Sequence, residues 1–100
     1  MEILYEEEGN GYIGLSWEDN IKVWILHIVC KEWSLSTYKR YKKIGERIKD
    51  ILRSRGIYEI YGLSDTKKEV KFNILFGGEL TDIIVETDKG KKKYLIKGVL

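Results

Sequence analysis

Apolar and polar side chains follow two different periods along this chain of 100 residues. In YIGLSW, residues 12–17, Ile, Leu and Trp occupy every second position, which predicts a strand with one apolar face. In KVWILHIVC, residues 22–30, apolar residues stand at both parities, which is typical of a central strand covered on both faces. Residues 36–55 predict a long helix, because apolar residues recur there at spacings of three and four: Tyr41, Ile44, Ile48, Ile51 and Leu52.

The stretch GNGYIG, residues 9–14, matches the pattern G-x-G-x-x-G of dinucleotide-binding loops. That fingerprint requires a helix directly after it, whose N-terminal N–H groups face the phosphates. A strand pattern follows here instead, and Asn10-Gly11 is the preferred pair for a type I′ hairpin turn. We therefore expect these glycines to serve a hairpin and not a nucleotide.

The rest of the chain completes the expected order of elements. Ser34 or Ser36 suits the N-cap of the long helix, and Gly56 suits the left-handed position after its end. A strand, a shorter helix and two more strands are expected over residues 57–63, 66–76, 78–87 and 91–99. The order β-β-β-α-β-α-β-β predicts a single α/β (α+β) domain over residues 1–100, with one mixed sheet and a parallel crossover around the long helix.

The composition indicates where the protein is expected to be located, but it says little about its activity. Apolar residues make up 43% and charged residues 34%, which is typical of a globular chain. No apolar run approaches the roughly 20 residues of a membrane span, and MEILYEEE lacks the basic flank and apolar stretch of a signal peptide. A lone Cys30 forms neither an internal disulfide nor a metal cluster. These features predict a cytoplasmic protein with no metal and no membrane partner.

The order of elements resembles the C-terminal part of the GNAT acetyltransferase fold. In that fold a central strand, a long helix, a splayed neighbouring strand, a shorter helix and a final hairpin build the acetyl-CoA site. The motifs W-x-L-S, Trp33 to Ser36, and F-x-x-x-x-G, Phe72 to Gly77, are similar to those of the small GNAT-like proteins of short-tailed bacteriophages. The resemblance implies a GNAT-like domain without the usual N-terminal helices, in the cytoplasm of a host or in a virion.

The expected cofactor site departs from the pattern of the family it resembles. GNAT enzymes place glycines at the start of the long helix, where backbone N–H groups approach the pyrophosphate, but WSLSTYKR has none. Ser34, Ser36 and Thr37 are the residues that would hold a phosphate there, and helix capping is the alternative role. Asn73 stands where the family usually has a tyrosine that protonates the leaving thiolate, and an amide cannot supply that proton.

Two residues of the central strand and its end are the candidate bases. His27 or Glu32 would have to deprotonate an incoming amine in an active enzyme. The alternatives are a hydrogen-bonded strand histidine and a solvated strand end. Cys30 has no evident base partner in the sequence and is expected to be a small buried residue.

The long helix is rich in Lys and Arg and has few acidic residues. A candidate interaction surface combines one aromatic residue with cations of this helix: Trp33, Lys39, Arg40, Lys43 and Arg47. Such a surface suits nucleic acid, and a simple solvated helix face is the alternative. Three tryptophans and open sheet edges also favour a protein partner or a homodimer.

We therefore expect a catalytically degenerate GNAT-like protein that binds a protein. It would be a virion component or an inhibitor of a host or defence protein, and it would need no cofactor. The first alternative is an acetyl-CoA-dependent N-acetyltransferase that uses His27 or Glu32. The second is a nucleic-acid-binding protein that uses helix 36–55.

Overall fold

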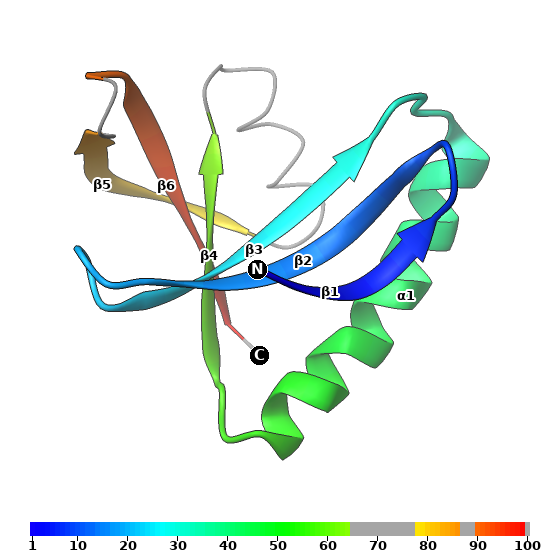
Figure 1. Ribbon diagram of the computed structural model, residues 1–100, viewed down its shortest axis with the longest axis horizontal. Coiled ribbons are helices and arrows are strands. Elements are labelled where there is room, and N and C mark those ends of the chain that lie inside the picture. The colour runs from blue at the N-terminus through cyan, green and yellow to red at the C-terminus, as the bar shows by residue number, and fades with distance from the viewer. Residues whose placement is uncertain (65–77, 87–89, 100) are drawn as a thin grey trace.

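The computed structural model describes residues 1–64, 78–86 and 90–99. These residues form one helix and a six-stranded sheet with the order β1-β2-β3-β4-β6-β5 (Figure 1). The elements are β1 Glu2–Glu7, β2 Gly11–Glu18, β3 Val23–Cys30, α1 Leu35–Ser54, β4 Glu59–Ser64, β5 Glu79–Glu86 and β6 Lys92–Val99. The mixed α+β class and the order of the described elements are confirmed. The predicted helix 66–76, with Asn73, lies outside the described residues.

The sheet is antiparallel except where β3 meets β4. The β2–β3 ladder runs along both strands, from Gly11 opposite Cys30 to Glu18 opposite Val23. The parallel β3–β4 pair has a single residue couple in register, Ile25 with Tyr61. Figure 1 shows the two strands diverging toward their carboxyl ends. The predicted parallel crossover around the long helix is confirmed.

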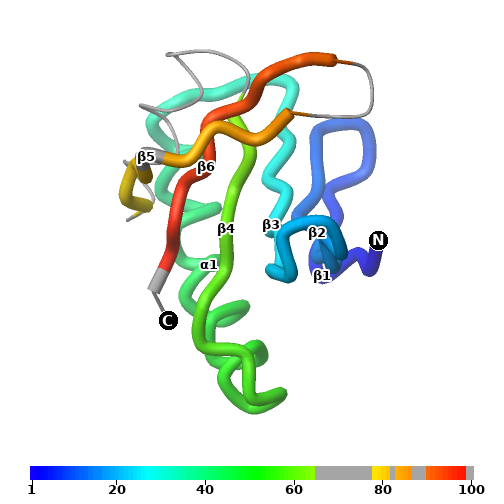
Figure 2. Tube along the Cα trace, turned by 90° about the vertical axis from the view of Figure 1, so that its left-hand side faces the viewer, coloured from blue at the N-terminus to red at the C-terminus, as the bar shows by residue number. Residues whose placement is uncertain are grey.

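Helix α1 packs on one face of the sheet (Figures 1 and 2). Tyr41, Ile48 and Leu52 from the predicted apolar stripe are buried, while Ile51 at its margin is exposed. The stripe is therefore narrower than the sequence predicted. The core cluster joins these helix residues to β2, to β4 and to the segment before β4: Ile13, Leu15, Tyr41, Ile48, Leu52, Ile57 and Ile60.

The predicted central position of β3 in the sheet is confirmed, but the strand is only partly covered, because Ile25 is buried whereas Val29 is 44% exposed. Leu26 and Ile28 pack against the helix-side cluster, and Ile25, which is buried, lies on the opposite face because side chains alternate along a strand. His27 shares that opposite face and is half-buried. The sheet therefore separates His27 from helix α1.

The first hairpin turn differs from the expected type I′ turn at Asn10-Gly11. Among the described non-glycine residues only Lys22 has a positive φ, and the turn glycine with a positive φ, 75°, is Gly9. The N–H of Asn10 donates to the carbonyl of Glu7 at 3.0 Å, so the central residues of the turn are Glu8 and Gly9, two positions earlier than expected. Gly11 starts β2, where a Cβ would lie 2.0 Å from the carbonyl oxygen of Val29. Its glycine is needed for close strand approach and not for a turn.

The end of helix α1 follows the sequence prediction closely. Gly56 has a φ of 78°, its N–H donates to Arg53, and the N–H of Ile57 donates to Leu52, which is the Schellman pattern. Because this cap uses the N–H of Ile57, strand β4 begins at Glu59 and not at residue 57 as predicted. The cap places residues 56–58 beside the start of β3, where a cleft forms.

Candidate functional site

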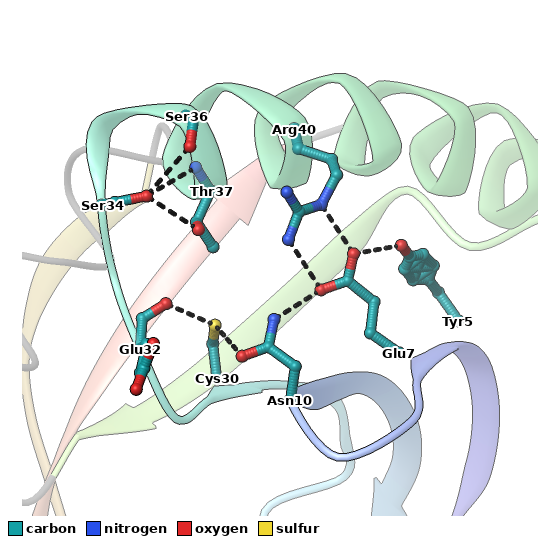
Figure 3. Close-up of polar contacts among 9 residues, drawn as sticks. All are labelled: Tyr5, Glu7, Asn10, Cys30, Glu32, Ser34, Ser36, Thr37 and Arg40. Atoms are coloured by element: carbon teal, nitrogen blue, oxygen red, sulfur yellow. Dashed lines mark hydrogen bonds and ion pairs between the residues drawn. The ribbon is translucent and has the colours of Figure 1, made fainter.

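The start of helix α1 brings the three predicted cofactor-binding residues together. Ser34 is the N-cap, and its Oγ accepts a hydrogen bond from the backbone N–H of Thr37 at 3.2 Å. The same oxygen lies 2.9 Å from the hydroxyl of Thr37 and 3.1 Å from that of Ser36 (Figure 3). The hydroxyls therefore contact one another and cap the helix, and the structure selects Ser34 for that role.

The electrostatics of this helix start favour an anion. No acidic residue lies in the first turn, so no side-chain carboxylate offsets the positive end of the helix dipole there. Leu35 and Ser36, the first two residues of the helix, are exposed, so their side chains lie at the surface of this helix start.

The two predicted bases lie in different surroundings. The Nε2 of His27 is 2.8 Å from the hydroxyl of Ser16 on β2, on the sheet face away from α1. Burial lowers the pKa of His27, and the positive charges of Lys93 and the N-terminus lower it further. Glu32 is exposed in the segment that joins β3 to α1. The sheet separates His27 from the start of α1, which Glu32 precedes.

Cys30 ends β3 on the helix side of the sheet and is half-buried, so it is less enclosed than the small buried residue that the sequence predicted. Its Sγ lies 3.6 Å from the side-chain oxygen of Asn10 and 3.2 Å from the backbone carbonyl oxygen of Glu32, and its single S–H can donate to either. An amide oxygen and a carbonyl oxygen accept hydrogen bonds but do not remove a proton at neutral pH. These contacts hold the thiol without activating it as a nucleophile.

A carboxylate cluster fastens the first hairpin to the helix (Figure 3). Arg40 donates to both oxygens of Glu7, at 2.6 and 3.0 Å, and Tyr5 and Asn10 donate to the same carboxylate. The Arg40 contact, followed by that of Tyr5, lowers the pKa of Glu7 to about 2. The buried Tyr41 hydroxyl lies beside this carboxylate, and burial first and the Glu7 carboxylate second raise its pKa.

The predicted interaction surface divides into two parts. Arg40 is held by Glu7, and the ring of Trp33 lies against Tyr41 with their centroids 5.3 Å apart. Lys39, Lys43 and Arg47 are exposed along α1 at intervals of four residues. Only these three residues of the predicted surface form a stripe of cations open to solvent.

A cleft of about 280 Å³ lies where β3 and β4 begin, beside the cap of helix α1. Trp17 on β2 and Trp24 on β3 are cross-strand partners, with an edge-to-face contact at 5.2 Å between ring centroids. Tyr58 and Tyr61 line the cleft from the β4 side. Trp17 is 47% exposed and Tyr58 is 61% exposed.

The residue pattern alone does not predict this cleft, although it contains one signal for it. The polar cluster at residues 18–20 marks a turn between the first two long strands. Antiparallel pairing across a turn in that region places Trp17 opposite Trp24, and such a pair of tryptophans close to a turn indicates an aromatic surface. The position of Tyr58 in the cleft depends on how the cap of α1 directs the chain into β4, and the residue pattern alone did not predict that direction.

The described residues also bear on other site types. They contain no helix that is long and apolar enough to cross a membrane, and no group of three or more metal-binding side chains. Of the two sheet edges expected from the sequence, the first hairpin supplies one through β1, but the last strand, β6, lies between β4 and β5, and β5 is the other outer strand of the described sheet. Comparison with protein-family models and with curated proteins gave no match.

Proposed function

We propose that this chain is a GNAT-like protein without acetyltransferase activity that acts by binding another protein. The described elements support the fold: β3 and β4 are parallel neighbours joined through α1, and they meet in a single residue couple, Ile25 with Tyr61. The resemblance implies a splayed strand pair of this kind. It also implies the setting, which is a virion component or an inhibitor of a host or defence protein.

The separation of one candidate base, His27, from the helix start supports the loss of activity, whereas the other, Glu32, is exposed just before that start. An acid or base acts only within hydrogen-bond reach of the proton it transfers. His27 bonds to Ser16 on the sheet face away from α1, whereas Ser34 caps the helix at its start. A cofactor held by the helix start would therefore be separated from the imidazole by the sheet. On this proposal the chain uses no cofactor, and acetyl-CoA is the cofactor of the alternative N-acetyltransferase function.

The observation that carries the binding role is the exposed aromatic cleft. Trp17 and Tyr58 expose about half of their surface or more at its rim. Large aromatic rings bury much apolar area with few rotatable bonds, so Trp and Tyr contribute heavily to protein interfaces. The rings are placed by two strands and a helix cap, which makes the cleft a preformed contact for a partner.

The cationic stripe on α1 supports nucleic-acid binding less strongly than the aromatic cleft supports protein binding. Lys39, Lys43 and Arg47 would neutralise about three phosphates, and the salt dependence of such binding scales with that number. Glu46 and Asp50 lie on the same helix, where they pair with Lys49 and Arg53. A surface of mixed charge suits a solvated helix face better than a nucleic-acid groove.

A capture experiment tests the proposed function. The wild-type chain, Trp17→Ala and Lys43→Glu would each be used to capture proteins from a lysate of the cells in which the gene is expressed. We expect one stoichiometric protein with the wild type and with Lys43→Glu, and its loss with Trp17→Ala. Loss with Lys43→Glu alone would move the interface to helix α1 and would contradict the role of the cleft.

Two titrations test the competing functions on the same samples. Micromolar binding of acetyl-CoA would overturn the claim that the cofactor site is lost. Binding of a DNA duplex whose affinity falls steeply with salt would replace the protein partner by nucleic acid. We expect no heat from acetyl-CoA at millimolar concentration and no specific DNA binding at physiological salt.

A further inference from the structure

The charges around the aromatic cleft are already paired with one another. Lys22, which lines the cleft, donates to Asp19 at 2.6 Å, and the indole N–H of Trp17 donates to the same oxygen at 3.4 Å. Glu59, also in the lining, pairs with Lys97 at 3.3 Å. Neither cation is therefore an unbalanced positive charge that would repel a cationic ligand.

The lining of the cleft is rich in aromatic residues. Four of them line it: Trp17 and Trp24 from β2 and β3, and Tyr58 and Tyr61 from the β4 side. The faces of such rings carry negative charge density, and Trp is the ring that binds cations best. A carboxylate has about four acceptor sites, so Glu59 can bind a second donor beside Lys97.

The size of the cleft limits what it can hold. Pockets for small molecules and cofactors usually enclose roughly 300–1,000 Å³. This cleft, at about 280 Å³, suits one long side chain better than a nucleotide cofactor. A guanidinium group fits its chemistry best, because it is planar, stacks on aromatic rings, is weakly hydrated and donates to a carboxylate at the same time.

We propose that the cleft formed by Trp17, Trp24, Tyr58 and Tyr61 binds an arginine side chain of a partner protein, with Glu59 accepting from the guanidinium. That the arginine belongs to a protein rests on the proposed function. The affinity for the guanidinium group itself does not, because it follows from the lining of the cleft.

The test uses the intact chain and two small probes. N-acetyl-arginine methylamide carries the cation, and N-acetyl-citrulline methylamide has the same shape without the charge. Binding is followed by NMR through the indole N–H signals of the three tryptophans. Trp17 and Trp24 line the cleft, whereas Trp33 lies against Tyr41 elsewhere and serves as an internal control.

We expect the arginine probe to shift the signals of Trp17 and Trp24 in a saturable manner and to leave Trp33 unchanged. The citrulline probe should bind about fivefold more weakly or not at all, which is the ratio expected for cation–π attraction at a partly exposed site. Glu59→Gln, a variant at an exposed residue, should weaken the arginine probe more than the citrulline probe.

Equal affinity for the two probes would overturn the inference, because the cleft would then be merely apolar. Equal shifts at Trp33 would overturn it as well, because binding would be non-specific. Neither probe needs a partner, so arginine binding without protein capture would refute the proposed function alone. Capture of a protein through Trp17 with no preference for arginine would refute the further inference alone.

Discussion

Arg40 and Glu7, which are 33 positions apart in the sequence, form a two-contact ion pair that joins helix α1 to strand β1. The Nε of Arg40 lies 2.6 Å from one carboxylate oxygen and its second terminal nitrogen lies 3.0 Å from the other (Figure 3). Bidentate pairs of this kind have defined geometry as well as charge attraction. Arg40, which the sequence predicted as part of an interaction surface, thus forms an ion pair within the protein itself.

Replacing Glu7 by Gln should reduce stability in a pH-dependent manner. The pKa of Glu7 is lowered from 4.5 to about 2, chiefly by Arg40. A carboxyl with a lowered folded-state pKa contributes stability above its unfolded-state pKa and loses it as the pH falls through the folded value. The urea midpoint of Glu7→Gln should therefore lie below that of the wild type at pH 7, and the difference should shrink between pH 4.5 and 2.

Glu8→Gln is the matched control, because Glu8 is an exposed neighbour in the same turn. Its urea midpoint should follow that of the wild type at every pH. A Glu7→Gln difference that stays constant down to pH 2 would show that the carboxylate does not stabilise the fold through its charge.

The neighbours Leu52 and Ile51 separate the buried and exposed sides of helix α1. Leu52 is 0% exposed and Ile51 is 41% exposed. Leu52→Ala should lower the free energy of unfolding by about 2–5 kcal/mol, because the substitution removes buried methyl groups and leaves a cavity. Ile51→Ala should change it by less than about 1 kcal/mol, since surface changes have small effects. Urea unfolding of both variants measures this contrast, and equal losses would contradict the burial of the stripe.

Two glycines should respond to alanine in opposite directions. At Gly11 a Cβ would lie 2.0 Å from the carbonyl oxygen of Val29, so β2 and β3 must separate. At Gly45, inside α1, nothing lies within 4 Å of a Cβ. Gly45→Ala should raise the free energy of unfolding by about 0.5–1 kcal/mol through helix propensity. Gly11→Ala should lower it, and thermal unfolding that showed the same sign for both would contradict the close contact.

The sequence predicted the described elements because their signals are local. The spacing of apolar residues marks helix α1 within one residue at each end, and Gly56 marks its cap. The turn at Gly9 was misplaced because the pair Asn10-Gly11 satisfies a local preference equally well. What decides there is the approach of Val29 to Gly11 from another strand, which is a tertiary contact.

The candidate site was harder to predict than the fold. The hydroxyls at the helix start are neighbours in sequence, and the structure indeed brings Ser34, Ser36 and Thr37 together. The roles of Arg40 and Trp17 depend on residues far along the chain. The first is set by an ion pair with β1 and the second by a cleft that β4 completes, and neither partner is encoded by local spacing.

His27 provides the last test, because it is the single histidine of the chain and its NMR signals are unambiguous. Burial first, and the charges of Lys93 and the N-terminus second, lower its pKa from 6.5. As the pH falls below about 6.5, the unfolded chain therefore binds more protons than the folded chain. The contribution of His27 to stability is complete above that pH and is lost as the pH falls through the folded-state pKa. An NMR titration should give a pKa below 6.5 for the imidazole.

Lys93→Gln should raise that pKa toward its ordinary value, whereas Lys91→Gln, at an exposed neighbour, should leave it unchanged. A catalytic base would be expected to titrate near the working pH. An imidazole pKa at or above 6.5 would contradict its half-buried position on the sheet and would reopen its candidacy as a base.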